Sequence, residues 1–171
     1  MWVENIENDK WEYVKHEIFK NLFQKGFDLI WYRDIDSVIT NMNIPITDFI
    51  DDEHDFFITR DFTELNGGSV IIRSSIKGQS FNRLVLRCKS RYQNEQNAYN
   101  HYREIMVNNN TMKVLPHPSI NSYKYYLYPE CKEYVGREDL GDWKEGNFVL
   151  HVPALALSKR LEILSQAKII E

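Results

Sequence analysis

Residues 27–36 have the sequence Phe-Asp-Leu-Ile-Trp-Tyr-Arg-Asp-Ile-Asp, an apolar run that ends in two carboxylates one residue apart. The run is typical of a β-strand, in which side chains alternate between two faces. We therefore expect Asp34 and Asp36 to project to the same side and to converge on one divalent cation. Carboxylate oxygens favour Mg²⁺ or Mn²⁺ over zinc. The alternative is a solvated strand end that binds nothing.

The composition predicts one globular domain over residues 1–171, because 171 residues with 43% hydrophobic content can bury roughly two thirds of the unfolded surface. The net charge is −4 and no Lys/Arg run exceeds two residues, which disfavours binding to nucleic acid or to an anionic membrane. No apolar run reaches the ~20 residues of a membrane span. We expect a soluble, cytoplasmic protein in which Cys88 and Cys131 are reduced.

The hydrophobic pattern predicts alternating helices and strands. An apolar stripe that starts at Trp11 predicts a helix. Asn8 or Asp9 can cap the start of this helix, and Gly26 ends it. The expected strands are 27–33, 56–59, 70–73 and 148–151, the expected helices lie within 79–105 and at 155–169, and short edge strands are expected within 112–129. This alternation indicates an α/β protein with a mostly parallel sheet flanked by helices, in which ligands bind beyond the carboxyl ends of the strands.

A glycine-containing segment, Asn66-Gly67-Gly68, joins the strands at 56–59 and 70–73. We expect a turn with positive φ angles, which lets a phosphate or a sugar hydroxyl approach the backbone N–H groups. The alternative is a plain turn. Arg73 ends an aliphatic strand and should pair with a buried carboxylate or with a ligand oxygen.

Three later positions carry polar groups that either bind a ligand or have an ordinary structural role. Glu95 and Gln96 open a helix, where a carboxylate also serves as a cap. His151 closes an apolar strand and is either a metal ligand or a structural histidine. Lys159 and Arg160 either contact a diphosphate or solvate a helix.

Taken in order, these segments resemble glycosyltransferase family 34, the galactosyltransferase and mannosyltransferase group with a GT-A fold. The resemblance spans residues 11–151 and lies in the ordered series rather than in any single motif. The matching segments are Asp-Ile-Asp-Ser-Val-Ile from Asp34, Asp61, Leu-Asn-Gly-Gly-Ser-Val-Ile-Ile-Arg-Ser-Ser from Leu65, Glu-Gln-Asn-Ala-Tyr from Glu95, Ile-Asn-Ser-Tyr from Ile120, and Glu-Gly-Asn-Phe-Val-Leu-His from Glu145.

The resemblance implies a retaining transferase that uses Mn²⁺ (or Mg²⁺) and moves a hexosyl unit from a UDP- or GDP-linked sugar to a glycan or glycoprotein acceptor. The implied metal ligands are Asp34, Asp36 and His151. The donor side would comprise Asn66, Gly67, Gly68, Arg73 and Lys159. Glu95 and Asp61 would be the catalytic residues and Gln96 would face the acceptor. Glu95 would stabilise an oxocarbenium-like sugar or act as a transient nucleophile.

The chain also departs from the family pattern. Family members carry further nucleotide-binding strands before the aspartate pair, so we expect an N-terminally abbreviated GT-A-like fold. Val152-Pro153-Ala154 replaces the small residue and glycine expected after the histidine.

Two other functions fit parts of the pattern. A haloacid-dehalogenase-type, Mg²⁺-dependent phosphatase would use Asp34-Ile35-Asp36-Ser37-Val38, a second signature at Val70–Ser74, and a late acidic group among Glu138, Asp139 and Asp142. A degenerate, non-catalytic carbohydrate-binding domain would keep the fold without the activity.

Overall fold

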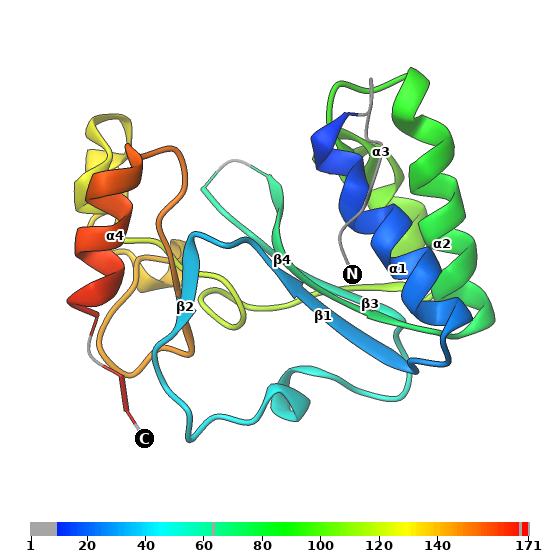
Figure 1. Ribbon diagram of the computed structural model, residues 1–171, viewed down its shortest axis with the longest axis horizontal. Helices are drawn as coiled ribbons and strands as arrows, with labels where there is room; N and C mark the ends of the chain where they lie inside the picture. The colour runs from blue at the N-terminus through cyan, green and yellow to red at the C-terminus, as the bar shows by residue number, and fades with distance from the viewer. Residues whose placement is uncertain (1–9, 63, 168, 171) are drawn as a thin grey trace.

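The computed structural model describes residues 10–62, 64–167 and 169–170. Its main elements are α1 (Val14–Gln24), β1 (Leu29–Arg33), β2 (Ser37–Ile39), β3 (Phe56–Arg60), β4 (Leu65–Arg73), α2 (Ile76–Arg87), α3 (Glu95–Asn108), β5 (Met112–Val114), β6 (Val149–His151) and α4 (Leu157–Ser165). Figure 1 shows α1, α2 and α3 gathered at one end of the molecule and α4 with β2 at the other. The expected cap at Asn8 or Asp9 lies outside the described residues.

The central sheet has four strands in the order β1-β4-β3-β5. β4 is antiparallel to both β1 and β3, and the parallel pair is β3 with β5. The expectation of a mostly parallel sheet was therefore wrong. Residues 61–64 are too few to form the crossover that parallel neighbours need, so β3 and β4 form a hairpin.

The glycine segment lies within β4 and not in a turn, which corrects the second sequence-based expectation. Neither Gly67 nor Gly68 has a positive φ angle. The β3–β4 register shifts between Ile58 and Thr59, where the ladder is irregular. The glycines are required because a side chain at either position would collide with Glu95 or His151.

Both faces of the sheet are buried. Side chains alternate along β3 and β4, so successive residues pack into two different cores. Phe56, Ile58 and Ile72 face the three helices and pack in a core with Phe19, Phe81 and Tyr99. Phe57 and Ile71 face the other way, into a second core with Ile120, Phe148 and Val149. Trp31 of β1 stacks on Phe148, with ring centroids 5.4 Å apart. The second core connects the sheet to the C-terminal segment.

A separate two-stranded sheet joins distant parts of the chain. β2 and β6 are antiparallel, with Ser37 opposite His151. α4 packs on this pair through Ile163, which is buried with Leu150 and Val152. The register of β2 and β6 therefore places His151 next to the turn that carries Asp34 and Asp36.

Local signals set the ends of the helices, and the predicted end of the first helix at Gly26 was confirmed. Gly26 adopts φ 84° just beyond α1. α2 and α3 each begin with a side-chain cap: Ser75 accepts a hydrogen bond from the N–H of Gly78, and Asn94 accepts one from that of Asn97. The two cysteines are free and buried. Among the described helices, none has the length and apolar character needed to cross a bilayer.

A buried histidine connects the three helices. His16 of α1 is fully buried, with Nδ1 2.6 Å from Asn82 Oδ1 and Nε2 2.6 Å from the Tyr99 hydroxyl. The Asn82 amide donates to the His16 carbonyl, so Nδ1 is the ring nitrogen that carries the proton. Burial lowers the pKa of His16 to about 3, against the opposing effect of the Asn82 hydrogen bond. The imidazole is therefore neutral in the folded protein.

The neutral His16 predicts a specific loss of stability in mild acid. Below pH 6.5 the unfolded chain protonates this imidazole and the folded chain does not, so the free energy of unfolding falls as the pH falls from 6.5 towards 4. The contribution is about 1 kcal/mol per pH unit. Urea unfolding of wild type and His16→Gln across this range measures it. The wild-type curve should be the steeper by that amount, and two parallel curves would contradict the assignment.

Candidate functional site

A turn and a strand pairing bring the predicted metal ligands together. β1 ends at Arg33, and residues 34–37 form a turn in which the N–H and hydroxyl of Ser37 both donate to the Asp34 carbonyl. Asp34 and Asp36 therefore converge through the turn and not through strand alternation. The N–H of Val152 donates to the Asp36 carbonyl, which sets His151 beside them. Ligand atoms of the three side chains all lie within 4.8 Å of one another.

His151 is oriented by a buried amide. Nδ1 donates to Asn121 Oδ1 at 3.0 Å, because the Asn121 amide nitrogen is itself donating to Asn66 Oδ1 and to the Tyr123 hydroxyl. Nε2 then faces the carboxylates, 3.0 Å from Asp36 Oδ1 and 3.9 Å from Asp34 Oδ2. A second partner that fixes the tautomer in this way is the usual arrangement around a metal-binding histidine.

The polar chain continues from Asn121 away from the histidine. Asn66 Oδ1 accepts from the Asn121 amide and from the N–H of Gly68, while Asn66 Nδ2 donates to Asp61 Oδ2 at 2.9 Å. Asp61 Oδ1 accepts from the N–H of Glu64. One connected set of hydrogen bonds therefore runs from Asp61 to His151.

The two glycines of β4 leave room for the side chains of His151 and Glu95 to lie directly against the strand. A Cβ at Gly68 would be 2.4 Å from Cε1 of His151, and a Cβ at Gly67 would be 2.5 Å from Oε1 of Glu95. Contacts this short do not occur, so any side chain here would displace the histidine or the glutamate. The N–H of Gly67 donates to Gln96 Oε1 at 2.6 Å.

Glu95 forms a buried ion pair. Nζ of Lys15 lies 2.7 Å from Glu95 Oε1 and 2.7 Å from the Gly67 carbonyl, and only 7% and 5% of the Lys15 and Glu95 side chains are exposed. The same ammonium lies 4.6 Å from the centre of the Tyr32 ring. Breaking such a pair by removing one partner leaves an uncompensated buried charge.

The charges around the aspartate pair favour the ionised carboxylate. The hydrogen bond with His151 is the largest cause that lowers the pKa of Asp36, and it outweighs the opposing effect of burial. Arg160 of α4 adds a contact at 2.7 Å to Asp36 Oδ2. Burial and a 2.7 Å hydrogen bond to Asp34 raise the pKa of Tyr32, so its hydroxyl stays protonated and donates.

Several of these groups line one cavity of about 440 Å³. The predicted site residues on its wall are Asp34, Asn66, Gly67, Gly68, Glu95, Gln96 and His151. Asp61 lines a second, adjoining cavity that shares Asn66 and Pro153 with the first. Asp36 lines a third hollow together with Asp34.

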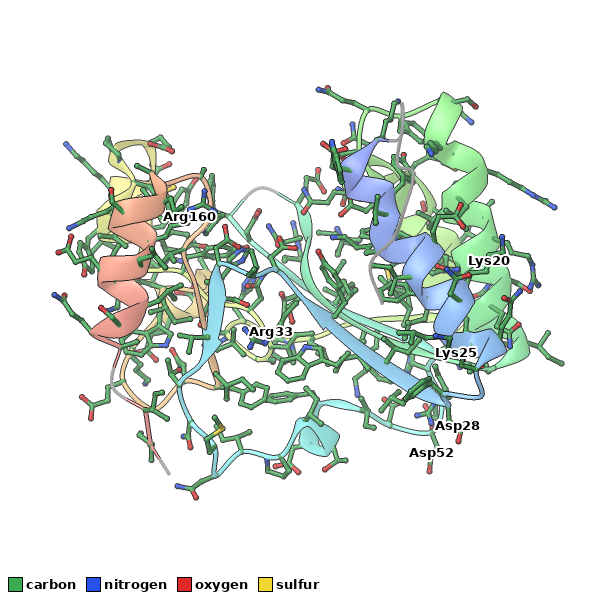
Figure 2. All side chains as sticks on the ribbon, viewed as in Figure 1. Lys20, Lys25, Asp28, Arg33, Asp52 and Arg160 are labelled. Atoms are coloured by element: carbon green, nitrogen blue, oxygen red, sulfur yellow. The ribbon has the colours of Figure 1, made fainter. Side chains whose placement is uncertain are left out.

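Two predicted donor-binding residues lie elsewhere. Arg73 is five residues beyond Gly68 on β4, about 16 Å away at ~3.3 Å per residue, where it donates to the Asp51 carbonyl. Lys159 is exposed and pairs with Glu162. In Figure 2, Arg160 lies beside α4 and Arg33 lies near the middle of the molecule, whereas Asp28 and Asp52 lie near the start of β1.

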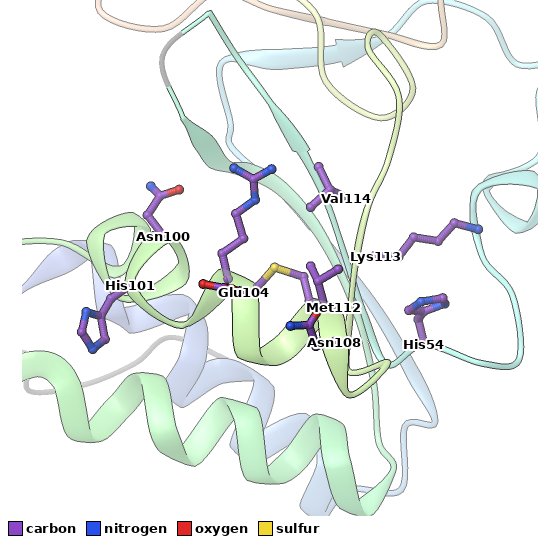
Figure 3. Close-up of a pocket in the computed structure, with 10 residues that line it drawn as sticks. His54, Asn100, His101, Glu104, Asn108, Met112, Lys113 and Val114 are labelled. Carbon is purple, nitrogen blue, oxygen red and sulfur yellow. The ribbon is translucent and has the colours of Figure 1, made fainter.

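A larger cavity, of about 750 Å³, lies between α3 and β5 and is shown in Figure 3. Its wall includes His54, His101, Glu104 and Lys113. No predicted site residue lines it. It is therefore separate from the candidate site.

The sequence analysis assigned no site role to Lys15, Tyr32 or Asn121. Lys15 could have been suspected from its spacing of four residues from Phe19, which places both on the buried face of α1. Arg160 lies three residues before the buried Ile163, whereas Lys159 points to solvent with Glu162. Asn121 lies in the Ile-Asn-Ser-Tyr segment that matches the family, but only tertiary structure brings it to His151.

Comparison with known proteins gives a structural match without a sequence match. No protein-family model matches the chain, and no curated protein sequence matches it. The structure is similar to that of a glycosyltransferase involved in the glycosylation of the major capsid of PBCV-1, with a TM-score of 0.68 and 14% sequence identity. The match covers 96% of this chain and 80% of that chain. At this identity the likeness shows a shared fold.

Removing the amide that orients His151 should weaken metal binding. In Asn121→Ala the Nδ1–H loses its acceptor, so we expect Mn²⁺ to bind about 10- to 100-fold more weakly, the usual cost of losing such a partner. Isothermal titration calorimetry measures it. Asn97→Ala, at an exposed position of α3, is the matched control and should bind Mn²⁺ as wild type does. Equal affinity in Asn121→Ala would show that the Asn121 contact does not orient a metal ligand.

Proposed function

We propose that this chain is a metal-dependent glycosyltransferase that moves a hexosyl unit from a nucleoside-diphosphate sugar to a glycan. One observation carries the proposal: Asp34, His151, Gly67, Gly68 and Glu95 share one cavity in a protein with a glycosyltransferase-like fold. The resemblance to glycosyltransferase family 34 supports the finer reading, a retaining reaction with Mn²⁺ and a UDP- or GDP-linked donor.

The donor atoms of the triad fit a divalent cation. Two carboxylates face the Nε2 atom of an imidazole whose Nδ1 is already donating to Asn121. A cation bound among these atoms would take Nε2 and the two carboxylates as its ligands, and Mn²⁺ accepts this mixture of oxygen and nitrogen ligands. Bound there, it would supply charge neutralisation to the departing nucleoside diphosphate.

Glu95 and Lys15 divide the work on the sugar side of the cavity. Lys15 holds the Glu95 carboxylate beside Gly67 through contacts of 2.7 Å to Glu95 Oε1 and to the Gly67 carbonyl, so the carboxylate needs no further rearrangement. Positive charge develops at the anomeric carbon as the donor bond breaks, and a preorganised carboxylate stabilises it. Gly67 and Gly68 leave the strand surface open to the sugar.

The proposed transfer is balanced as follows. A hydroxyl oxygen of the acceptor forms the new bond to the anomeric carbon, and the bond from that carbon to the diphosphate oxygen breaks. The electron pair leaves with the nucleoside diphosphate, and the hydroxyl proton passes to the carboxylate of Asp61. Hydrogen bonds from Asn66 and from the N–H of Glu64 keep that carboxylate in place.

The phosphatase alternative loses its support in this fold. Its second signature requires the end of the strand at Val70–Ser74 to lie beside the aspartate pair. β4 is antiparallel to β1, so the N–H of Ser74 donates to the Asp28 carbonyl, at the opposite end of β1 from Asp34. Asp139, one of the late acids, is exposed and paired with Arg137.

A thermal-shift screen tests the proposed function. Wild type should be stabilised by a UDP- or GDP-linked hexose when Mn²⁺ is present and not when it is absent, because the ion and the nucleotide bind together. Asp36→Asn removes one ligand charge but preserves the shape of the side chain, so it should abolish this shift. Asp48→Asn, at an exposed position of the loop after β2, should behave as wild type does.

Two results would contradict the proposal. Stabilisation of wild type by nucleotide sugars without any metal would show that binding of the donor needs no ion at Asp34, Asp36 and His151. No stabilisation by any of UDP-glucose, UDP-galactose or GDP-mannose, with Mn²⁺ or with Mg²⁺, would favour the non-catalytic carbohydrate-binding alternative.

Replacement of Glu95 should separate chemistry from nucleotide binding. Glu95→Gln keeps an oxygen that accepts from Lys15 but loses the negative charge. We expect transfer to fall by a factor of about 10² or more, the scale for loss of one charge-stabilising group. Metal-dependent binding of the nucleoside diphosphate should stay within about twofold of wild type, since the ligand charges are unchanged.

Calorimetry and a donor-turnover assay on the same preparation measure both quantities, with Glu104→Gln on the exposed side of α3 as the control. Weakened nucleotide binding in Glu95→Gln would place the residue at the nucleotide. Unchanged turnover would reduce it to a helix cap.

A further inference from the structure

A small aromatic cavity adjoins the candidate site on the side of Asp61. Its volume is about 170 Å³. Its wall consists of Asp61, Phe62, Asn66, Tyr123, Tyr125, Tyr128, Glu130, Cys131, Pro153 and Ala154. Asn66 and Pro153 also line the 440 Å³ cavity, so the two spaces meet at these residues.

We infer that this aromatic cavity is the subsite that takes the sugar ring of the acceptor. The inference deepens the proposed function and rests on it, because only a transferase has an acceptor. It also assigns the acceptor to a place other than Gln96, whose side chain is already engaged by the N–H of Gly67.

The size of the cavity selects a single ring. At about 30 Å³ of liquid volume per water, it has room for about five or six waters, which corresponds to one monosaccharide. A nucleoside diphosphate is far larger. The donor must therefore lie in the 440 Å³ cavity beside the aspartate pair, and the aromatic cavity remains for the second substrate.

The side chains match the chemistry of a pyranose. One face of such a ring presents C–H groups, which pack on aromatic side chains, and its edge carries hydroxyls that need polar partners. Tyr123 and Tyr125 are stacked, with centroids 5.8 Å apart, and Phe62 meets the Tyr125 ring edge-on at 5.7 Å. The carboxylates of Asp61 and Glu130 and the amide of Asn66 supply the polar partners.

The cavity wall is fixed before any ligand binds. The Tyr125 hydroxyl donates to the Leu140 carbonyl and the Tyr128 hydroxyl donates to the Pro153 carbonyl. These tyrosines are 1% and 8% exposed, and Phe62 and Glu130 form the exposed rim. A preformed wall lowers the entropy cost of ordering that binding would otherwise carry.

Its position also fits the direction of transfer. Asp61 lies on the wall of the aromatic cavity and connects through Asn66 and Asn121 to His151. An acceptor ring held here presents a hydroxyl to Asp61 on one side and to the donor cavity on the other. Asn66 is the residue between the two substrates.

Saturation-transfer NMR with simple sugars tests the inference on the metal-free protein without a nucleotide. The probes are the methyl glycosides of glucose, galactose and mannose. Wild type should transfer saturation to the ring protons of at least one of them. Phe62→Ala removes a rim aromatic and should weaken that binding about tenfold. Glu130→Gln, a conservative change at an exposed position, should weaken it as well.

Matched controls are Phe27→Ala, a half-exposed aromatic at the far end of β1, and Glu53→Gln in the exposed loop before β3. Both should bind the sugar as wild type does. No saturation transfer to any probe in wild type, or equal transfer in Phe62→Ala, Glu130→Gln and the controls, would overturn the inference.

The test separates this inference from the proposed function. Sugar binding that depends on Phe62, in a protein that shows no metal-dependent response to nucleotide sugars, would keep the subsite and contradict the transferase. A metal-dependent response to nucleotide sugars, with sugar binding unaffected by Phe62 and Glu130, would keep the transferase and contradict the subsite.

Discussion

His151 is held between two partners, and the geometry of the candidate site depends on that position. Asn121 Oδ1 accepts a hydrogen bond from Nδ1, which directs Nε2 at the two aspartates. The β2–β6 pairing fixes the backbone, and Gly68 leaves the space that the ring fills. A change at any of these three points moves the imidazole relative to Asp36, and so changes the charge and the coordination that the site offers.

A second charged group, the carboxylate of Glu95, lies against the same strand. Glu95 packs on Gly67 as His151 packs on Gly68, and Lys15 forms an ion pair with Glu95 at 2.7 Å. In the aspartate pair, Asp34 accepts a hydrogen bond from Tyr32 and Asp36 accepts one from Arg160. Two adjacent glycines on β4 therefore support a cation-binding group and a buried carboxylate side by side. In the proposed reaction the first faces the diphosphate and the second faces the sugar.

The sequence was informative where the signal is local. The apolar strand before Asp34 and the start of α3 at Glu95 follow from neighbouring residues, and the structure has both. The glycine pair was assigned to a turn, but it lies inside β4. The strand periodicity of β3 and β4 is the same in a hairpin and in a crossover, so it did not reveal the strand direction. The short connection between the two strands did favour a hairpin. The contacts of His151 with Asn121 and of Arg160 with Asp36 join residues 30 and 124 positions apart. Pattern along the chain carries no information about such pairs.

The most direct test of the central claim is a crystal structure with Mn²⁺, using anomalous scattering to locate the ion. The account predicts one strong peak within ligand distance of Asp34, Asp36 and Nε2 of His151, with Nδ1 still donating to Asn121. A fully loaded crystal with no peak there, or a peak ligated by other residues while the three side chains stay as described, would contradict it.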